Sequence, residues 1–158
     1  MKTLVVYYSR SSVTKKIAEV IAKEINADIE EIIDNKKRSG VIGFIKSGYE
    51  AAYDKLTKIE EIKSNLEDYD LVILGTPVWA GKPSTPATTF IKKYHTHIKN
   101  LAVFITHGSP SNEYRSAINF IENASDKKGI KALSSPANIV KNNNFKEVIA
   151  FAKELCKE

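Results

Sequence analysis

Cysteine is nearly absent from this chain, and histidine is scarce. Cys156 is the single cysteine among 158 residues, so neither a disulfide framework nor a cysteine-built metal site can form within the chain. Three histidines occur, and His95 and His97 have no third ligand at a suitable spacing. We therefore expect no metal site and no catalytic residue of the metal-dependent or cysteine-dependent classes.

Long hydrophobic runs and long basic stripes are missing as well. No apolar run approaches the roughly 18 residues needed to span a membrane, and the first strand pattern begins at once, so we expect no secretory signal and a cytoplasmic protein without membrane insertion. The net charge is +5, from 24 Lys and Arg against 19 Asp and Glu. These lysines are scattered along expected helices without interleaved aromatic residues, so we interpret them as a solvated basic surface and expect no nucleic-acid partner.

Short apolar runs are present, and they indicate buried strands. The runs Leu4–Tyr8, Leu71–Leu74 and Leu101–Ile105 are continuous, which is typical of strands covered on both faces in a parallel sheet. Two more polar runs, Asp28–Ile33 and Ile130–Val140, suit the edges, since a proline interrupts the second of them.

Between these strands, apolar residues recur at helical spacing. Five such faces begin at Val13, Val41, Ala87, Tyr114 and Phe145. Thr85 is the expected N-cap of the third helix, with Pro86 at its first position. The alternation of strand and helix predicts one α/β domain over residues 1–158, a three-layer α/β/α sandwich around a five-stranded parallel sheet in the order 2-1-3-4-5.

Three loops of unusual composition follow strands of this predicted sheet. They span Ser9–Thr14, Thr76–Pro83 and Thr106–Asn112. Ligands of open α/β sheets bind beyond the carboxyl ends of the strands, where the strand order reverses. In the order 2-1-3-4-5 that point lies between the first and third strands, so we expect the three loops to form one site.

The first loop is rich in hydroxyl groups and leads into a helix. Its hydroxyls belong to Ser9, Ser11, Ser12 and Thr14. Lys15 and Lys16 open the helix, although a helix start favours negative charge. A bound phosphate would offset them and would use the free N–H groups of the helix start. The alternative is that one serine caps the helix while the lysines face water.

The other two loops suit a flat ring. The second loop carries the single tryptophan, Trp79, between Pro77 and Pro83, where the indole could stack on an aromatic ligand or pack into the core. In the third loop, Gly108 permits close backbone approach and His107 offers a polar contact.

These loops together resemble those of the flavodoxin family. Residues 9–14 (SRSSVT) are similar to the flavodoxin phosphate loop, whose common form is S-x-T-G-N-T, and residues 75–81 (GTPVWAG) are similar to the second flavin-contacting loop. Residues 38–51 (RSGVIGFIKSGYEA) also resemble a segment of flavodoxin-like proteins. Two departures stand out: Ser12 and Val13 replace the usual Gly-Asn pair, and the chain is basic whereas electron-carrying flavodoxins are typically acidic.

The resemblance implies a flavodoxin-like fold with FMN bound non-covalently, and it assigns three groups of cofactor-binding residues. The phosphate group comprises Ser9, Arg10, Ser11, Ser12, Val13 and Thr14. The group along the isoalloxazine comprises Thr76, Pro77, Val78, Trp79, Ala80 and Gly81. The group on the pyrimidine side comprises Thr106, His107, Gly108 and Ser109.

The leading functional hypothesis is an FMN-binding electron-transfer protein, in which the cofactor carries the redox chemistry. An NAD(P)H-dependent FMN or quinone reductase on the same fold is the alternative, and a flavodoxin-like module that has lost flavin binding is a third. A phosphoacceptor receiver needs acidic residues where this chain has Ser9-Arg10 and Gly75-Thr76, which argues against it. We expect redox partner proteins, acidic ones among them, and a monomer or weak dimer.

Overall fold

A computed structural model describes residues 1–36, 38, 40–53, 55–108 and 113–157. Within these residues the strands form one six-stranded sheet in the order β2-β1-β3-β5-β6, with β4 paired to β3 outside this path. The strands are β1 (Thr3–Tyr7), β2 (Asp28–Glu31), β3 (Leu71–Trp79), β4 (Lys82–Pro83), β5 (Leu101–His107) and β6 (Lys131–Pro136). All pairs are parallel except β3 with β4, so the predicted order 2-1-3-4-5 is confirmed.

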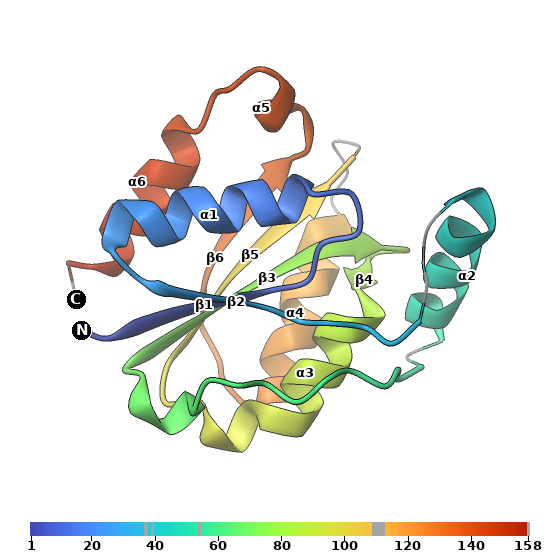
Figure 1. Cartoon of the computed structure of the whole chain (residues 1–158), viewed down its shortest axis with the longest axis horizontal. Coiled ribbons are helices and arrows are strands. Elements are labelled where there is room, and N and C mark those ends of the chain that lie inside the picture. The colour runs from blue at the N-terminus through green and yellow to red at the C-terminus, as the bar shows by residue number, and fades with distance from the viewer. Residues whose placement is uncertain (37, 39, 54, 109–112, 158) are drawn as a thin grey trace.

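Helices cover both faces of the sheet (Figure 1). They are α1 (Val13–Ile25), α2 (Gly40–Ala52), α3 (Thr85–Tyr94), α4 (Glu113–Ser125), α5 (Asn138–Lys141) and α6 (Lys146–Leu155). The helices α1 and α6 pack together on one face, and α3 and α4 pack together on the other. This is the predicted three-layer sandwich, with α2 set apart from both layers, beyond one end of the sheet (Figure 1).

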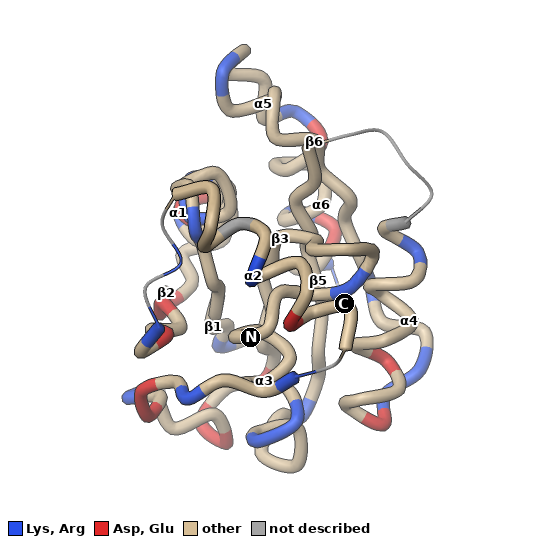
Figure 2. Tube along the Cα trace, turned by 90° about the vertical axis from the view of Figure 1, so that its right-hand side faces the viewer, with Lys and Arg blue, Asp and Glu red and all other residues tan. Residues whose placement is uncertain are grey.

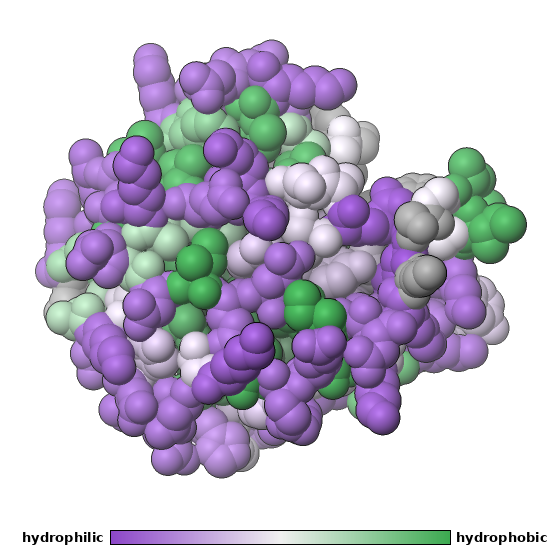
Figure 3. Space-filling model, viewed as in Figure 1, coloured by the Kyte–Doolittle hydropathy of each residue, from purple (hydrophilic) through white to green (hydrophobic). Residues whose placement is uncertain are grey.

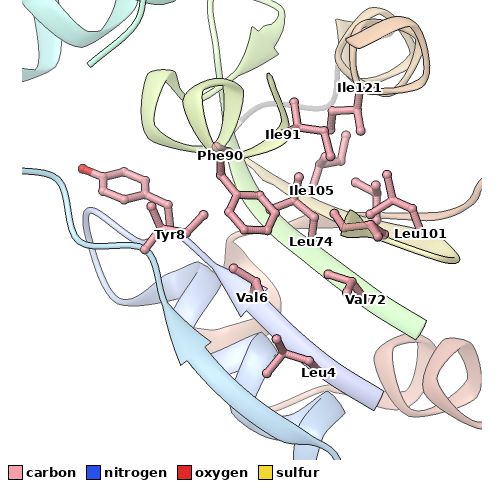
Figure 4. Packing of buried hydrophobic residues seen from close by; sticks show 14 of the residues in the cluster. Leu4, Val6, Tyr8, Val72, Leu74, Phe90, Ile91, Leu101, Ile105 and Ile121 are labelled. Atoms are coloured by element: carbon pink, nitrogen blue, oxygen red, sulfur yellow. The ribbon is translucent and has the colours of Figure 1, made fainter. Parts of the chain in front are cut away.

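The core explains why the strand sequences are continuously apolar. Successive residues of a strand point to opposite faces, so Leu4 and Val6 pack toward α3 and α4 while Val5 packs toward α1 and α6. Figure 4 shows the first of these two clusters, in which Phe90 lies over β1 and β3. Both Phe90 and Val5 are fully buried, and a fully buried side chain of this size stabilises the fold by roughly 1.5–3 kcal/mol.

The segment Thr76–Pro83 is a β-hairpin, so its prediction as a loop was wrong. β3 continues to Trp79, and β4 returns antiparallel with Trp79 opposite Lys82. The two turn residues, Ala80 and Gly81, have φ angles of 48° and 74°. Positive φ at both central residues is what a two-residue hairpin turn requires, because its twist then matches that of the strands.

Other boundaries also differ from the sequence predictions, and β2 ends at Glu31 instead of Ile33. The last strand ends at Pro136 instead of Val140, because the chain turns there into the short helix α5. The N-cap of α3 is Ser84 rather than Thr85, since Ser84 keeps an extended ψ of 148° and its carbonyl accepts the N–H of Thr88 at 2.9 Å. Thr85 is therefore the first helical residue.

The surface mixes both signs of charge. Figure 2 shows the Lys and Arg positions of the described residues dispersed along the trace and interspersed with Asp and Glu. Among the residues that the structure describes, no helix combines the length and the apolar character needed to cross a bilayer.

Candidate functional site

A groove of about 200 Å³ lies at the carboxyl ends of β1, β3 and β5. The strand order reverses there, which is where open α/β sheets bind ligands. Its lining comes from four chain segments: Arg10, Ser11, Val13 and Thr14; Pro77, Val78 and Trp79; Thr106, His107 and Gly108; and Ala137. The structure thus brings together residues from each of the three predicted loops.

The other residues assigned by sequence lie outside this lining. Ser9, Ser12, Thr76, Ala80 and Gly81 are neighbours of lining residues but do not border the groove. The hydroxyl of Thr76 is buried and bonds Ser84 Oγ at 2.9 Å, where it ties the hairpin to the start of α3. Ser109 falls outside the described residues, so its assignment stays a prediction.

Ala137 was missed from the sequence. Its N–H donates to the carbonyl of His107 at 2.9 Å, so the chain after β6 lies beside the end of β5. The sequence could have indicated this contact, because the end of a parallel strand beside β5 must reach the same edge of the sheet. The contact was missed because the last strand was predicted to continue to Val140, which places Ala137 inside the strand.

The start of α1 has the features of an anion site. Its N-cap, Ser12, has a left-handed φ of 65° and makes no side-chain capping bond, and the first turn carries no acidic residue. The first N–H groups of a helix have no partner within it and carry partial positive charge. The hydroxyl of Ser9 is also buried without a hydrogen-bond partner among the described residues.

Lys15 and Lys16 make ion pairs along the surface of the molecule. The Nζ of Lys15 lies 4.0 Å from a carboxylate oxygen of Glu31, and that of Lys16 lies 3.6 Å from Glu19. Their positive charges are therefore balanced without an anion in the groove. Arg10 lines the groove, and the backbone N–H groups and serine hydroxyls at the start of α1 are further donors for an anion.

A buried hydrogen bond joins the first loop to the third. The hydroxyls of Thr14 and Thr106 lie 2.8 Å apart, and both side chains are buried. We expect Thr14→Val to lower the free energy of unfolding by roughly 1–2 kcal/mol, because the partner hydroxyl is left unsatisfied. Urea unfolding should show that adding Thr106→Val restores part of this loss. Strictly additive effects would contradict the coupling.

Trp79 forms a wall of the groove and is also part of the core. Its side chain is 7% exposed. The indole meets the ring of Tyr8 edge to face, with ring centroids 5.6 Å apart, and the Arg38 guanidinium lies 5.4 Å from its ring centroid. Burial raises the pKa of Tyr8 to about 12, so this phenol stays neutral against the indole. Contact of Trp79 with a ligand ring stays a prediction.

Arg38 fixes α2 next to this wall, and the sequence analysis assigned no role to it. The guanidinium bonds the Asp34 carboxylate, lies 2.7 Å from Glu50 Oε2 and donates to Ser47 Oγ at 3.2 Å. Burial opposes the ionisation of Glu50, but hydrogen bonds from Lys36 and Arg38 hold its pKa below the ordinary carboxyl value. The side chains of Arg38, Asp34 and Glu50 are nearly inaccessible to solvent.

His107 is held in place at the end of β5. Its Nε2 lies 3.0 Å from the hydroxyl of Ser134. Its ring stacks on Tyr114 at a centroid distance of 6.2 Å and an interplanar angle of 20°. These contacts fix the position of the His107 side chain at the edge of the groove.

Three larger hollows lie elsewhere and are less suited to chemistry. One of about 680 Å³ lies at the opposite end of the sheet, beside Lys99 and Lys127. Another of about 390 Å³ follows β2 and residues 60–64, and a third of about 320 Å³ lies between α4 and β6. None of them includes a lining residue from the start of α1 or the carboxyl ends of β3 and β5. We therefore assign the site to the groove by its chemistry.

The strand order and the groove at the reversal point define a doubly wound α/β domain of the type that binds nucleotides at this edge. The sequence model of the family described as flavodoxin matches residues 2–128. The chain belongs to the flavodoxin family. A comparison with curated proteins finds no match.

Solved structures with the same fold cover nearly the whole chain. A flavoprotein from Lactobacillus acidophilus NCFM, crystallised in complex with FMN, has a TM-score of 0.70 and 23% identity, covering 92% of this chain and 99% of its own. Oxidised flavodoxin 2 from Bacillus cereus has a TM-score of 0.66 and 19% identity, with 99% of each chain covered. A Fusobacterium nucleatum flavodoxin bound to flavin mononucleotide has a TM-score of 0.62 and 13% identity, covering 99% of this chain and 98% of its own.

Proposed function

We propose that this protein binds FMN non-covalently and transfers electrons. One observation carries the proposal: the start of α1, which has no side-chain cap, lies at the groove, and in the loop before it the hydroxyl of Ser9 is buried without a partner among the described residues. Such a helix start stabilises a phosphate group. Family membership supports the proposal, and two of the relatives with this fold are FMN complexes.

The residues of the groove would divide the work of binding. Backbone N–H groups at the start of α1, with the hydroxyls of Ser9 and Ser11, would hold the phosphate. The ends of β3 and β5 would flank the ring, with Trp79 as one wall and the backbone around Gly108 opposite it. When bound, FMN supplies the redox chemistry, and the protein positions the ring and limits its contact with water.

FMN is expected to bind at least about tenfold more tightly than riboflavin, because each charge-assisted hydrogen bond to the phosphate contributes roughly 1.5–3 kcal/mol. Calorimetric titration of the apoprotein measures both dissociation constants. Ser9→Ala should weaken FMN binding and leave riboflavin binding unchanged. Thr85→Val is the matched control, since Thr85 also has a buried hydroxyl without a partner among the described residues but, unlike Ser9, lies at the start of α3 and outside the loop that leads into α1. Equal dissociation constants for the two flavins would refute the phosphate assignment.

Binding of FMN is also expected to quench the fluorescence of the single tryptophan. Trp79 borders the groove, so a flavin ring seated there lies within contact distance of the indole. Tryptophan emission is recorded while the apoprotein is titrated with FMN. The measurement is repeated with a saturating concentration of riboflavin, because riboflavin carries the same ring as FMN. Unchanged emission in the saturated complex would place the ring away from Trp79.

One measurement distinguishes an electron carrier from a reductase that turns over. A reductase oxidises NAD(P)H steadily when FMN or a quinone is supplied, whereas a carrier is reduced once by a partner and waits for an acceptor. We propose the carrier, because the sequence shows no second dinucleotide-binding motif beside the groove. Steady-state NAD(P)H oxidation by the flavin-loaded protein would assign it to the reductases instead. As a carrier it would act in the cytoplasm as a monomer or weak dimer, with redox proteins, acidic ones among them, as partners.

A further inference from the structure

The helix α2 exposes its apolar side and buries its polar side. Apolar residues point outward, with 52–83% of each residue exposed: Val41, Ile42, Ile45 and Tyr49 in α2, and Tyr53 and Leu56 in the segment after it. On the opposite side, Ser47 and Glu50 are buried against Arg38. A surface helix normally has the reverse arrangement. We call the six outward residues the α2 ridge.

The ridge stands out from the body of the molecule. Figure 1 shows α2 beyond the sheet, apart from the two helical layers. Figure 3 shows hydrophobic side chains gathered at the outer end of α2, on a convex part of the surface. Scattered exposed apolar residues need no explanation, but a contiguous row of this kind marks an interaction site.

Positive charge flanks the ridge. Within residues 36–58 the sequence has six basic and two acidic residues. In the part of that segment that the structure describes, the exposed charged side chains are Lys36, Lys46, Lys55 and Lys58. The one described acidic side chain of α2, Glu50, is buried and paired with Arg38 and Lys36. The partner of the ridge should therefore be apolar inside and negatively charged outside.

The shape and charge of the ridge decide between partners of that kind. α2 has 13 residues and forms most of the ridge, so the ridge is about 20 Å long. A second copy would bring the same lysines close to one another, which is unfavourable. A lipid bilayer with negatively charged headgroups accepts a convex apolar helix with basic flanks.

We propose that the α2 ridge docks the protein on the surface of an anionic lipid bilayer, with α2 lying in the plane of the interface. The isoleucines enter the boundary between headgroups and acyl chains. The rings of Tyr49 and Tyr53, whose centroids are 4.6 Å apart and whose planes are tilted by 44°, lie at headgroup level, where tyrosine is favoured. Lys46 and Lys55 face the lipid phosphates. Arg38 contacts both Glu50 of α2 and the ring of Trp79, and it forms what we call the Arg38 network with Asp34 and Glu50. This network then holds the groove next to the membrane surface.

Sedimentation with large unilamellar vesicles tests the docking with the full chain. One vesicle is phosphatidylcholine alone, and the other is an equal mixture of phosphatidylcholine and phosphatidylglycerol. We expect binding to the anionic vesicle at least about tenfold stronger than to the neutral one, weakening as salt is added. Failure to sediment with either vesicle overturns the proposal, whatever else α2 binds.

Two pairs of variants locate the binding on the ridge. Ile42→Ser combined with Ile45→Ser should weaken binding to the anionic vesicle by about tenfold or more, whereas Ile33→Ser, an exposed isoleucine outside α2, should leave it unchanged. Lys46→Glu combined with Lys55→Glu should abolish the preference for the anionic vesicle, and Lys157→Glu should preserve it. Binding that survives the isoleucine changes overturns the proposal. Self-association without vesicle binding, lost in the same variant, would assign the ridge to a second copy.

The changes lie on exposed side chains, so folding is not at risk. Thermal unfolding of each variant should match that of the wild type, which checks this directly. Vesicle binding is measured without flavin, so its outcome is independent of the proposed redox function.

Discussion

Arg38→Met is expected to lower the free energy of unfolding by about 3–5 kcal/mol, because it leaves the buried carboxylate of Asp34 without its cation and leaves that of Glu50 with Lys36 alone. Methionine keeps the apolar length of the side chain, so the loss comes mainly from charge. Urea unfolding followed by the fluorescence of Trp79, which lies beside Arg38, measures it. Lys36→Met is the matched control: Lys36 pairs with the same Glu50, but its side chain is 45% exposed, so we expect a loss of about 1 kcal/mol or less.

The same network gives the stability a dependence on pH with a defined sign. The pKa of Glu50 is lower in the folded protein than its ordinary value. Its contribution is therefore fully present above the ordinary carboxyl pKa, and it is lost as the pH falls toward the lowered folded pKa. In Arg38→Met the folded pKa should rise, so the acid side of the stability curve should flatten. If Arg38→Met left the dependence of stability on pH unchanged, or lost no more free energy of unfolding than Lys36→Met, the ion pairs of Arg38 with Asp34 and Glu50 would be solvated rather than buried.

Gly75→Ala is expected to destabilise the fold by about 3 kcal/mol, the upper end of the range for overpacking a core. Gly75 lies in β3 directly opposite Phe104 of β5. A Cβ atom at Gly75 would lie 2.2 Å from Phe104 Cζ. The phenyl ring is fully buried and cannot turn away, so β3 must shift just before it enters the hairpin that carries Trp79. Urea unfolding measures the loss.

A second substitution separates the clash from other effects of the alanine. Gly75→Ala combined with Phe104→Leu should lose less than the sum of the two single variants, because leucine vacates the space that the new Cβ needs. Gly48→Ala is the matched control. A Cβ at Gly48 meets nothing within 4 Å, and alanine within α2 should stabilise the helix by about 0.5–1 kcal/mol. If Gly75→Ala left the free energy of unfolding unchanged, β5 would be able to shift away from the new Cβ atom at little cost.

The fold was predictable because strands that are buried on both faces of a sheet have continuously apolar sequences. Leu4–Tyr8 and Leu101–Ile105 are apolar throughout, and parallel strands under two helical layers require this. The β3–β4 hairpin has no comparable pattern in its sequence. Its turn pairs Ala80 with Gly81, and alanine at positive φ is not a turn signal that a reader of sequence would choose.

The site was predictable only as far as strand ends dictate it. Residues after β1, β3 and β5 had to converge, and the groove contains them. The Arg38 network could not be inferred, because it depends on how α2 is oriented, and the outward apolar face of α2 contradicts the usual rule for placing a helix. The apolar spacing from Val41 predicted the helix correctly but would have turned its other side to the core.

The left-handed backbone at Ser12 bears on how this loop changes over evolutionary time. A side chain in that conformation costs roughly 1–2 kcal/mol, whereas glycine, the usual residue of flavodoxins here, loses roughly 0.5–1 kcal/mol more conformational entropy on folding. The two penalties partly offset each other, so an exchange of serine and glycine at position 12 changes the stability of the fold by about 1 kcal/mol or less. Genetic drift alone can then remove the glycine from a lineage, and sequence searches that demand it would overlook proteins whose backbone still follows the same path.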